Sequence, residues 1–400
     1  MTKSDDKRVP VLRFKGFTDE WEQRKLGDLT QKIKSYPISH DAEINTITGT
    51  KYIHYGDIHT GKLKRITNEK ILPNINDNNY IPLKSGDVIV ADASEDYKGI
   101  ADACVIDLMK EHYKIVSGLH TIVFRPNERL KSDFLYTYFH TPIFKHYGYR
   151  VGTGLKVFGI TYNNLSNMEI KLPKIDEQNK VYKIINIVTN IITLQQRKLE
   201  LLKAIKKAGI QQISKQKLII KDEVNNKYVS INVGKTFKVT RGNVLSKENI
   251  SPCKTNSTPY PVYSSQTKND GLLGYFDRYL FENAITWTTD GANAGTVKFR
   301  SGKFFSTNVS GVLISNNGYA NEINAEILNS VTYKYVSHVG NPKLMNNVMK
   351  DINITIPSTK SLQNKFSNFI LNLKININKQ EEKIQNYKFI KQFLLQNMFI

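Results

Sequence analysis

The chain has 400 residues, 40% of them hydrophobic and 10% aromatic, so it is too long for one ordinary core and too apolar for a disordered protein. Its formal net charge of +21 at pH 7 favours a polyanionic partner, since neutralised phosphates release counterions, although a solvated lysine-rich surface would give the same total. Cys104 and Cys253 stand far apart without a CxxC pair, which excludes a zinc ribbon or a disulfide scaffold and fits a reducing cytoplasm.

The N-terminal segment, residues 1–17, lacks the apolar run of a signal peptide. The most apolar helical stretch, VYKIINIVTNIITL, is interrupted by Lys183, Asn186, Thr189 and Asn190, so it cannot span a bilayer at low cost. We therefore expect a soluble, cytoplasmic protein that has no membrane partner.

Two globular segments are predicted, one over residues 18–175 and one within residues 217–358, a range that also includes a linker. Both contain short runs typical of strands, bounded by Gly, Asn and Asp: GDVIVA and HTIVF in the first, NAITW, GTVKF and SGVLI in the second. Their openings resemble one another, as WEQRKLGDLTQKIK and YVSINVGKTFKVTRG. The polar, lysine-rich stretch ISKQKLIIKDEVNNK (213–227) is typical of a linker.

Each globular segment ends in the same pattern. LSNMEIKLP (165–173) matches MKDINITIP (349–357), where alternating apolar residues before a proline predict a half-buried strand. Both copies continue with Gln-Asn-Lys and then with apolar residues spaced by three and four, which predicts long helices over 176–216 and 359–400.

A long helix with one apolar stripe needs a partner, and the repeat itself is the obvious one, in a coiled-coil-like pair. Two unrelated amphipathic helices in one large domain are the alternative. The residues expected to pair the helices are Val181, Ile184, Val188, Ile191, Leu199, Leu202, Phe366, Phe369, Leu373, Ile377, Ile384 and Tyr387.

Catalytic motifs are incomplete. Gly234-Lys235-Thr236 resembles the end of a phosphate-binding loop, but Val229 stands where that motif requires glycine. Asp87 followed by Asp96-Tyr97-Lys98 imitates a nuclease site that would bind a hard cation, so a metal-dependent nuclease stays a weaker alternative. The scattered histidines predict no metal site, and the weight shifts from catalysis to binding.

Several loops combine amides, hydroxyls, aromatic rings and cations, the side chains that hydrogen-bond base edges and grip phosphates. An ordinary turn is the alternative for each loop taken singly. In the first segment the candidates for DNA contact are Tyr55, His59, Lys62, Tyr97, Lys98, His120, Arg150, Thr153 and Lys156. In the second segment they are Ser264, Ser265, Gln266, Lys268, Thr289, Asn293, Asn308 and Lys343.

The opening VPVLRFKGFTDEWEQRKLGDL, the repeated strand-proline-QNK-helix unit, and YPVYSSQTKNDGLLGYF with TTDGANAGTV resemble the specificity subunits of type I restriction–modification systems, especially those of Gram-positive firmicutes. The resemblance covers essentially the whole chain. It implies an α+β fold: two mixed α/β target recognition domains, separated by two long antiparallel, coiled-coil-like helices with pseudo-two-fold internal symmetry.

The resemblance also implies the function of a DNA-binding subunit without catalysis of its own. Each globular segment would recognise one half of an asymmetric, bipartite double-stranded DNA target, and the helices would set the spacer. They would dock two modification subunits that methylate adenine N6, and restriction/motor subunits would join them. S-adenosylmethionine, ATP and Mg would bind the partner subunits, and this chain would bind no cofactor.

One feature departs from the first copy of the repeat. Ser361-Leu362 stands where the first copy has Asp176-Glu177, so we expect the helix start and its docking contacts to differ at that end. A stand-alone sequence-specific DNA-binding regulator remains the main alternative function.

Overall fold

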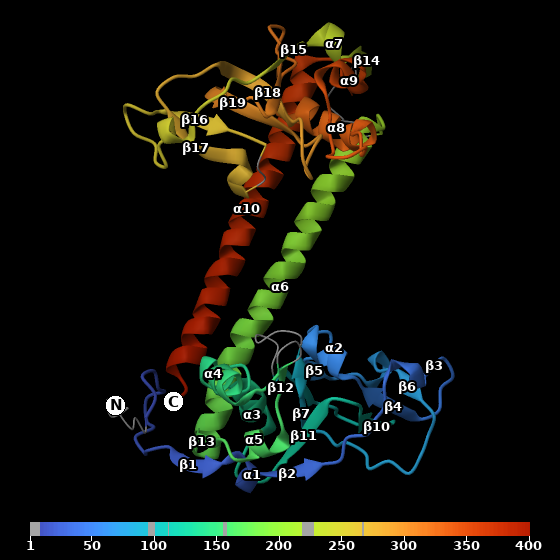
Figure 1. Cartoon of the computed structure of the whole chain (residues 1–400), viewed down its shortest axis with the longest axis vertical. Helices are drawn as coiled ribbons and strands as arrows, with labels where there is room; N and C mark the ends of the chain where they lie inside the picture. Colours follow the sequence, from blue (N-terminus) through green and yellow to red (C-terminus); the bar gives the residue numbers. More distant parts are fainter. Residues whose placement is uncertain (1–8, 95–100, 111, 155–157, 218–227, 266–267) are drawn as a thin grey trace. The chain divides into compact units, whose positions relative to one another are not determined.

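The computed structural model describes residues 9–94, 101–110, 112–154, 158–217, 228–265 and 268–400. Contacts divide the chain into two compact units (Figure 1): unit 1 comprises residues 1–194 and 384–400, and unit 2 comprises residues 195–383. Among the described residues, no helix combines the length and the apolar composition that crossing a membrane requires.

Two sheets form the body of unit 1. The five-stranded sheet has the order β2 (Thr30–Ile33), β11 (Thr121–Pro126), β7 (Val88–Ala91), β9 (Ala103–Ile106) and β5 (Arg65–Ile66). The four-stranded sheet has the order β10 (Lys114–Ser117), β4 (Thr50–Ile53), β6 (Asn74–Ile75) and β3 (Glu43–Ile44). β10 lies parallel to β4, whereas β7 pairs antiparallel with both β9 and β11.

The GDVIVA run forms the centre of the larger sheet, and all four residues of β7 are buried. Val88 and Val90 face one apolar cluster, while Ile89 and Ala91 face another, as the two-residue period of a strand requires. A strand covered on both faces shows no apolar–polar alternation, which explains the continuous apolar run. The helices of unit 1 are α1 (Leu26–Leu29), α2 (Tyr55–His59), α3 (Ser132–Tyr138), α4 (Pro142–Val151) and α5 (Tyr162–Ser166).

Unit 2 is built on one six-stranded sheet. Its order is β15 (Lys238–Arg241), β20 (Ser310–Ile314), β18 (Phe281–Thr288), β19 (Val297–Ser306), β16 (Tyr260–Tyr263) and β17 (Leu272–Phe276). Helix α8 (Glu322–Thr332) packs against it, with Ile323 and Ile327 in the same apolar cluster as Trp287. The strand predictions for NAITW, GTVKF and SGVLI are therefore confirmed, and the two globular segments contain unlike sheets.

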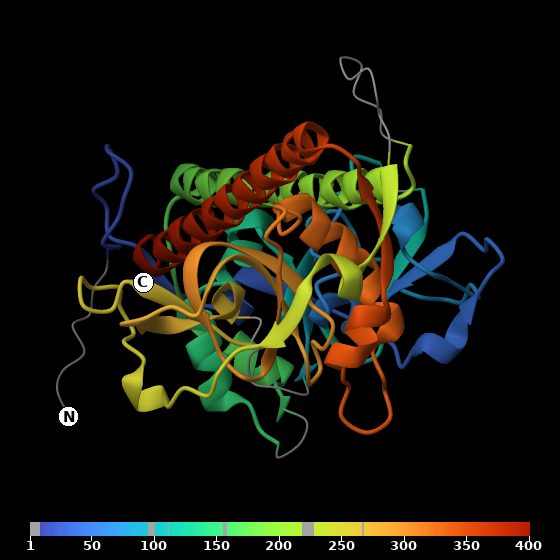
Figure 2. The same cartoon turned by 90° about the horizontal axis from the view of Figure 1, so that it is seen from above.

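The same small frame recurs in both units. In unit 1, β1 (Glu22–Lys25) pairs antiparallel with β13 (Glu169–Leu172); in unit 2, β14 (Tyr228–Asn232) pairs antiparallel with β21 (Asn353–Pro357). Figure 2 shows β14 in yellow beside β21 in red-orange. A short helix follows each opening strand: α1 in unit 1, and α7 (Val233–Thr236) in unit 2.

A glycine in each short helix lets a second helix approach closely. A Cβ atom at Gly27 would lie 3.1 Å from the Ser166 carbonyl oxygen in α5, and one at Gly234 would lie 3.0 Å from the Lys350 carbonyl oxygen in α9 (Asn346–Asp351). Gly234 of the Gly-Lys-Thr sequence therefore has a packing role, which agrees with the rejection of a phosphate-binding loop.

Each frame continues into a long helix: α6 (Ile175–Ser214) after Pro173, and α10 (Lys360–Asn397) after Pro357. Ile213 and Ser214 belong to α6, as the helix prediction for 176–216 had it, and this corrects the linker interpretation of these two residues; Ile213 is fully buried in the core of unit 2. The rest of that stretch from residue 218 lies outside the described residues.

A buried glutamine anchors the start of both long helices. In unit 1, Gln178 Nε2 donates to the carbonyl oxygens of Pro173 and Arg129, each at 2.9 Å, and Oε1 accepts from Lys131 N at 2.8 Å. In unit 2, Gln363 Nε2 donates to the Pro357 carbonyl oxygen at 2.7 Å, and Oε1 accepts from Asn321 at 2.7 Å. The Gln of each Gln-Asn-Lys sequence thus ties the helix start to its own globular segment.

The long helices contact each other within each unit. In unit 2, Gln380 Nε2 lies 2.6 Å from Gln195 Oε1, and a Cβ atom at Gly209 would lie 3.1 Å from the Phe369 ring. As residue numbers rise along α6 they fall along α10, so these parts of the helices run in opposite directions. In unit 1, Val181 and Ile185 share an apolar cluster with the α10 end.

The predicted pairing residues differ in burial. Val181, Val188, Phe366, Leu373, Ile377 and Ile384 are buried; Ile184, Ile191, Leu199, Leu202 and Tyr387 are partly buried. Phe369 is 40% exposed although its ring contacts α6. Sequence periodicity missed other buried residues at the helix ends: Ile210, Leu362, Leu395 and Met398.

Candidate nucleic-acid interface

Three predicted contact residues of the first segment gather around the short ladder of β8 (Ala93–Ser94) and β12 (Phe158–Gly159). His120 Nδ1 lies 3.1 Å from the Asp92 carboxylate, and the His120 ring centroid lies 5.3 Å from that of Tyr55. Thr153 exchanges two backbone hydrogen bonds with Gly159. The backbone of His120 is left-handed, with φ at 57°, and its side chain is 47% exposed. Tyr55, His120 and Thr153 therefore stand close to one exposed surface.

Two further candidates lie on or just after α2 and contact carboxylates. His59 Nδ1 lies 3.4 Å from Asp102, which also pairs with Lys145 at 2.6 Å. Lys62 Nζ lies 2.9 Å from the buried Asp57 carboxylate and is 64% exposed. Lys62 can therefore still reach a phosphate, whereas His59 is held among charges of unit 1.

The remaining candidates of the first segment are not brought to this surface. Arg150 lies at the end of α4 with its guanidinium carbon 5.5 Å from the Tyr147 ring centroid, beside a hollow lined by the frame residues Gln23 and Glu169. Tyr97, Lys98 and Lys156, like Gln266 of the second segment, lie outside the described residues.

Two histidines near this surface were not predicted. The rings of His40 and His54 lie with centroids 3.7 Å apart, and His54 Nδ1 accepts a hydrogen bond from Gly56 N, capping α2. Burial, together with the neighbouring His40, lowers the pKa of His54. A neutral His54 keeps the acceptor that the cap requires. Sequence spacing gave no signal, since His40 lies in a different loop.

In the second segment, the three loops that carry Asn293, Asn308 and Lys343 are joined by backbone hydrogen bonds, one of them from Thr289 N to the Val309 carbonyl oxygen at 3.5 Å. Gly291 N donates to the Pro342 carbonyl oxygen at 2.9 Å, and Leu344 N donates to that of Thr289 at 2.9 Å. Asn293, Asn308 and Lys343 are exposed on these loops. Their arrangement can present two amides and one cation together.

The structure corrects the prediction that Thr289 contacts DNA. It is fully buried, and its hydroxyl lies 2.9 Å from the Val309 carbonyl oxygen and 2.7 Å from an Asp290 carboxylate oxygen. A buried hydroxyl cannot reach a base, so Thr289 supports the loops and does not contact DNA directly.

The loop after β16 carries Ser264 and Ser265, both partly buried, and closes through a hydrogen bond from Ser264 N to the Gly271 carbonyl oxygen. Lys268 begins the short η4 turn (Lys268–Gly271). Asp270, at φ 54°, bonds Arg300 at 2.9 Å and also pairs with Lys298.

Arg300 was missed from the sequence. Only 5% of it is exposed, and its guanidinium carbon lies 3.9 Å from the Tyr263 ring centroid. Burial opposes ionisation of Asp270, but the hydrogen bond from Lys298 and the charge of Arg300 outweigh it and lower the pKa of the carboxyl. No sequence signal pointed to Arg300, since Tyr263 and Asp270 lie far from it along the chain.

The structure removes Asp87, the first residue of the proposed metal-dependent nuclease site, from that alternative. Asp87 is fully buried, and its carboxylate accepts two hydrogen bonds of 2.7 Å from Arg125 and one of 2.8 Å from Lys84 N. A carboxylate that is buried and fully hydrogen-bonded in this way stabilises the core of unit 1 and is not available to bind a metal cation. Asp96 and Lys98 lie outside the described residues, and in the described part of the chain no cluster of three His, Cys, Asp or Glu could hold a metal.

A family model described as "Type I restriction modification DNA specificity domain" matches the chain twice, at residues 18–204 and 225–394. Among curated relatives, a type I specificity subunit of Mycoplasma pneumoniae is 38% identical over 138 residues, 33% of this chain and 36% of the relative. The N-terminal part of a second such subunit from the same organism is 37% identical over 145 residues, 34% of this chain and 75% of the relative. The match thus spans only about a third of the first relative.

Two solved structures share the fold. The S subunit of a type I restriction–modification system from M. genitalium matches with a TM-score of 0.65 at 13% identity, over 98% of this chain and 99% of that one. A chain from a study of complex assembly and conformational transition of a type I system matches with a TM-score of 0.52 at 13% identity, over 95% and 97%. At this identity the likeness concerns the fold alone.

Proposed function

Because the chain belongs to the type I restriction–modification DNA specificity family, we propose that it is the non-catalytic DNA-recognition subunit of such a complex, acting in the cytoplasm. Each globular segment recognises one half of an asymmetric, bipartite double-stranded DNA target. The observation that carries this proposal is a frame present twice, holding two unlike sheets. The two similar frames can each bind one of two identical modification subunits, while the two unlike sheets can recognise two different DNA half-sites.

The DNA contacts proposed are those with a side chain on or near an exposed loop. In the first segment these are Tyr55, Lys62, His120 and Thr153, with His59 and Arg150 as weaker candidates; in the second they are Ser264, Ser265, Asn293, Asn308 and Lys343. Tyr97, Lys98, Lys156, Gln266 and Lys268 stay predictions from the sequence. The chain's net charge of +21 supports phosphate contact beyond these residues.

The long helices are proposed to pair antiparallel in a coiled-coil-like arrangement with pseudo-two-fold symmetry, to set the spacer and to dock two adenine-N6 methyltransferase subunits. Large apolar side chains remain uncovered on both helices, which supports docking. They include Leu194, Leu201 and Ile205 on α6, and Leu371, Phe389 and Phe393 on α10. S-adenosylmethionine, ATP and Mg would bind the methyltransferase and the restriction/motor subunits.

The test is a methylome. The chain is expressed with a type I modification subunit from the same host, and N6-methyladenine is mapped across the genome by single-molecule sequencing. A gapped, asymmetric motif that disappears without this chain is the expected result. If a folded complex forms without new methylation, while the chain alone binds a DNA sequence, the stand-alone regulator replaces this proposal.

A further inference from the structure

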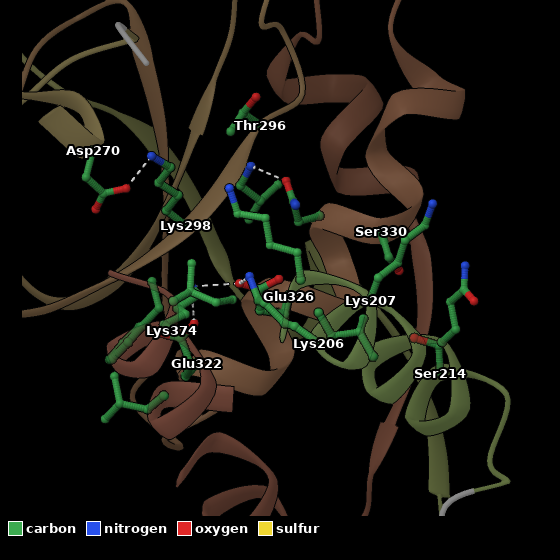
Figure 3. A pocket seen from close by; sticks show the side chains of 18 of the residues that line it. Lys206, Lys207, Ser214, Asp270, Thr296, Lys298, Glu322, Glu326, Ser330 and Lys374 are labelled. Atoms are coloured by element: carbon green, nitrogen blue, oxygen red, sulfur yellow. Dashed lines mark hydrogen bonds and ion pairs between the residues drawn. The ribbon is translucent and has the colours of Figure 1, made fainter. Parts of the chain in front are cut away.

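A cavity of about 1180 Å³ in unit 2 lies where α6, α8 and α10 meet β19. Figure 3 shows a group of four charged side chains in its lining: Lys206 from α6, Lys374 from α10, and Glu322 and Glu326 from α8. We call these four residues the charged cluster. It joins a helix of the second globular segment to both long helices.

The geometry of the charged cluster centres on one oxygen atom. Glu326 Oε1 lies 2.8 Å from Lys206 Nζ and 2.6 Å from Lys374 Nζ, while Glu322 pairs with Lys374. The carboxylate side chains are 10% and 13% exposed for Glu326 and Glu322. Because the two carboxylates are mostly buried, moving a lysine partner away would leave them poorly solvated, so the cluster opposes separation of its three helices.

Glu326 and Lys374 are both ionised in the folded chain. Burial alone would raise the pKa of Glu326, but the charges of Lys374 and Lys206 outweigh it and lower that pKa. Burial would likewise lower the pKa of Lys374, yet Glu326 and Glu322 raise it. The pair of Glu326 and Lys374 therefore stays ionised near neutral pH.

The polar contacts of α8 to the long helices lie near its start and in its middle, while Asn329, nearer its end, accepts a hydrogen bond from Val297 N of β19 at 2.8 Å. Near its start, the Gln363 side chain of α10 accepts hydrogen bonds from Asn321 and Asn324, at 2.7 and 3.2 Å. Further along, Glu326 reaches Lys206 on α6. A helix held at one point can pivot about it, whereas a second attachment to a different helix fixes its direction. Apolar contacts of Ile323 and Ile327 with this core are non-directional and cannot do this alone.

We propose that the charged cluster is a positioning group that fixes the direction in which the second globular segment is held on the long helices, and thereby the number of base pairs between the two half-sites. This inference rests on the proposed function. Lys206, Glu322, Glu326 and Lys374 touch no DNA; they act through the placement of the recognition loops.

The test compares spacer lengths in the complete complex. Glu326→Gln is assembled with the modification subunits and offered plasmids carrying both half-sites with the native spacer, or a spacer one base pair longer or shorter. The ratio of methylation at shifted to native spacers should rise about tenfold, within the range for residues coupled in one network. The half-site bases should not change.

The matched control is Glu381→Gln. Glu381 lines the same cavity and pairs with Lys203 at 2.6 Å, but this pair joins α6 to α10 without touching α8. It removes the same charge, so a general effect on DNA binding would appear in both variants. We expect the spacer ratio of Glu381→Gln to equal that of the wild type.

An unchanged spacer ratio in folded Glu326→Gln would overturn the inference, as would a uniform loss at all spacers, which marks a merely structural role. If Glu326→Gln does not fold, Glu322→Gln, which removes only a contact to Lys374, decides by the same ratio. A wild-type complex without any gapped motif would overturn the proposed function and this inference together. A normal wild-type motif with insensitive variants overturns the inference alone.

Discussion

Gln178 and Gln363 have the same structural role in the two units, because each buried amide donates a hydrogen bond to the carbonyl oxygen of the proline before its long helix. Replacing either one by alanine leaves a buried carbonyl without a donor and a buried donor without an acceptor. The cost of such unpaired groups is about 1–3 kcal/mol each.

We therefore expect Gln178→Ala to destabilise unit 1, and Gln363→Ala to destabilise unit 2, by about 2 kcal/mol. Amide hydrogen exchange resolved by unit measures the effect. The neighbouring Asn179 and Asn364 are exposed, so their alanine variants serve as controls. Equal protection in the Gln and Asn variants would contradict the anchoring role.

Gly234 offers a second test at this scale. Gly234→Ala should lower the free energy of unfolding by about 1–3 kcal/mol, because the new methyl group meets the α9 backbone. Lys235→Ala, on the exposed side of the same sequence, should leave both stability and nucleotide binding unchanged. ATP binding that is lost with Lys235→Ala would restore the phosphate-loop interpretation.

His140 predicts a pH dependence of unit 1. Its Nδ1 donates to the Tyr136 carbonyl oxygen at 2.7 Å, which raises its pKa, as does Asp102; burial, with Lys145 and Lys391 nearby, outweighs both and lowers the pKa from 6.5 to about 4. Between pH 6.5 and about 4, His140 binds a proton in the unfolded chain but not in the folded chain. The free energy of unfolding therefore falls as the pH drops through this range.

Thermal unfolding at pH 7 and pH 5 measures this dependence. His140→Gln should lose part of the difference between the two pH values, because its side chain does not titrate. The exposed His146→Gln is the control and should retain the wild-type difference. A His140→Gln profile parallel to the wild type would show that other groups cause the pH dependence.

Single residues were the least predictable part of the candidate site. Loop composition selected Asn293 and Lys343, which are exposed, but it could not separate them from Thr289, whose hydroxyl turns inward to Val309. Arg300 was invisible because its value comes from Tyr263 and Asp270, which lie far from it in sequence. A side chain's direction depends on the strands that pair around it, and sequence alone does not give that pairing.

At the scale of elements, periodicity predicted both long helices because a one-sided apolar stripe persists over many turns. It could not tell which part of each stripe faces the other helix. Leu395, Met398 and Phe399 instead join the aromatic core of unit 1, beside Trp21 and Phe134. Strands were predicted where apolar runs were bounded by turns, but the sheet order was not, since pairing partners are distant in sequence.

Gln380 tests the contact between the long helices. It is 5% exposed, and its amide bonds the Gln195 side chain and carbonyl oxygen at 2.6 and 3.0 Å. Gln380→Leu alone should lower the stability of unit 2 by about 1–3 kcal/mol, because it leaves the Gln195 amide unpaired. The double variant with Gln195→Leu should recover most of this loss.

Urea unfolding of the two variants, side by side, measures the difference. A single variant as stable as the double variant would contradict the pairing of these two amides. The expected recovery follows from the general observation that a buried polar pair fixes register more than it adds stability.

At the scale of the whole molecule, the repeat was visible in the sequence because the same frame contacts are made by similar residues in both copies. The bases recognised were not visible, since the two sheets between the frames are unlike and their loops set the contacts. The charge of +21 predicted a polyanion, but no particular sequence of one.

The proposed spacer role predicts the effect of matched insertions. Four helical residues inserted after Leu194 in α6 and after Lys383 in α10 lengthen each helix by about 6 Å. At about 3.4 Å per base pair, the spacer of the methylated motif should grow by about 2 base pairs while both half-sites persist. The methylome of the variant complex measures this. An unchanged spacer would exclude the helices as its determinant.

The core of unit 1 also constrains the order in which the protein can be made. Phe399 packs against Trp21 and Phe134, with ring centroids 6.4 and 5.3 Å apart, and Asn397 accepts a hydrogen bond from Leu12 N. The ribosome adds about 5–20 residues per second, so synthesis of unit 2, residues 195–383, takes about 10 to 40 seconds before residues 384–400 are made. During that interval the aromatic core around Trp21 and Phe134 lacks Phe399 and stays exposed, so a chaperone that binds nascent chains can bind it then.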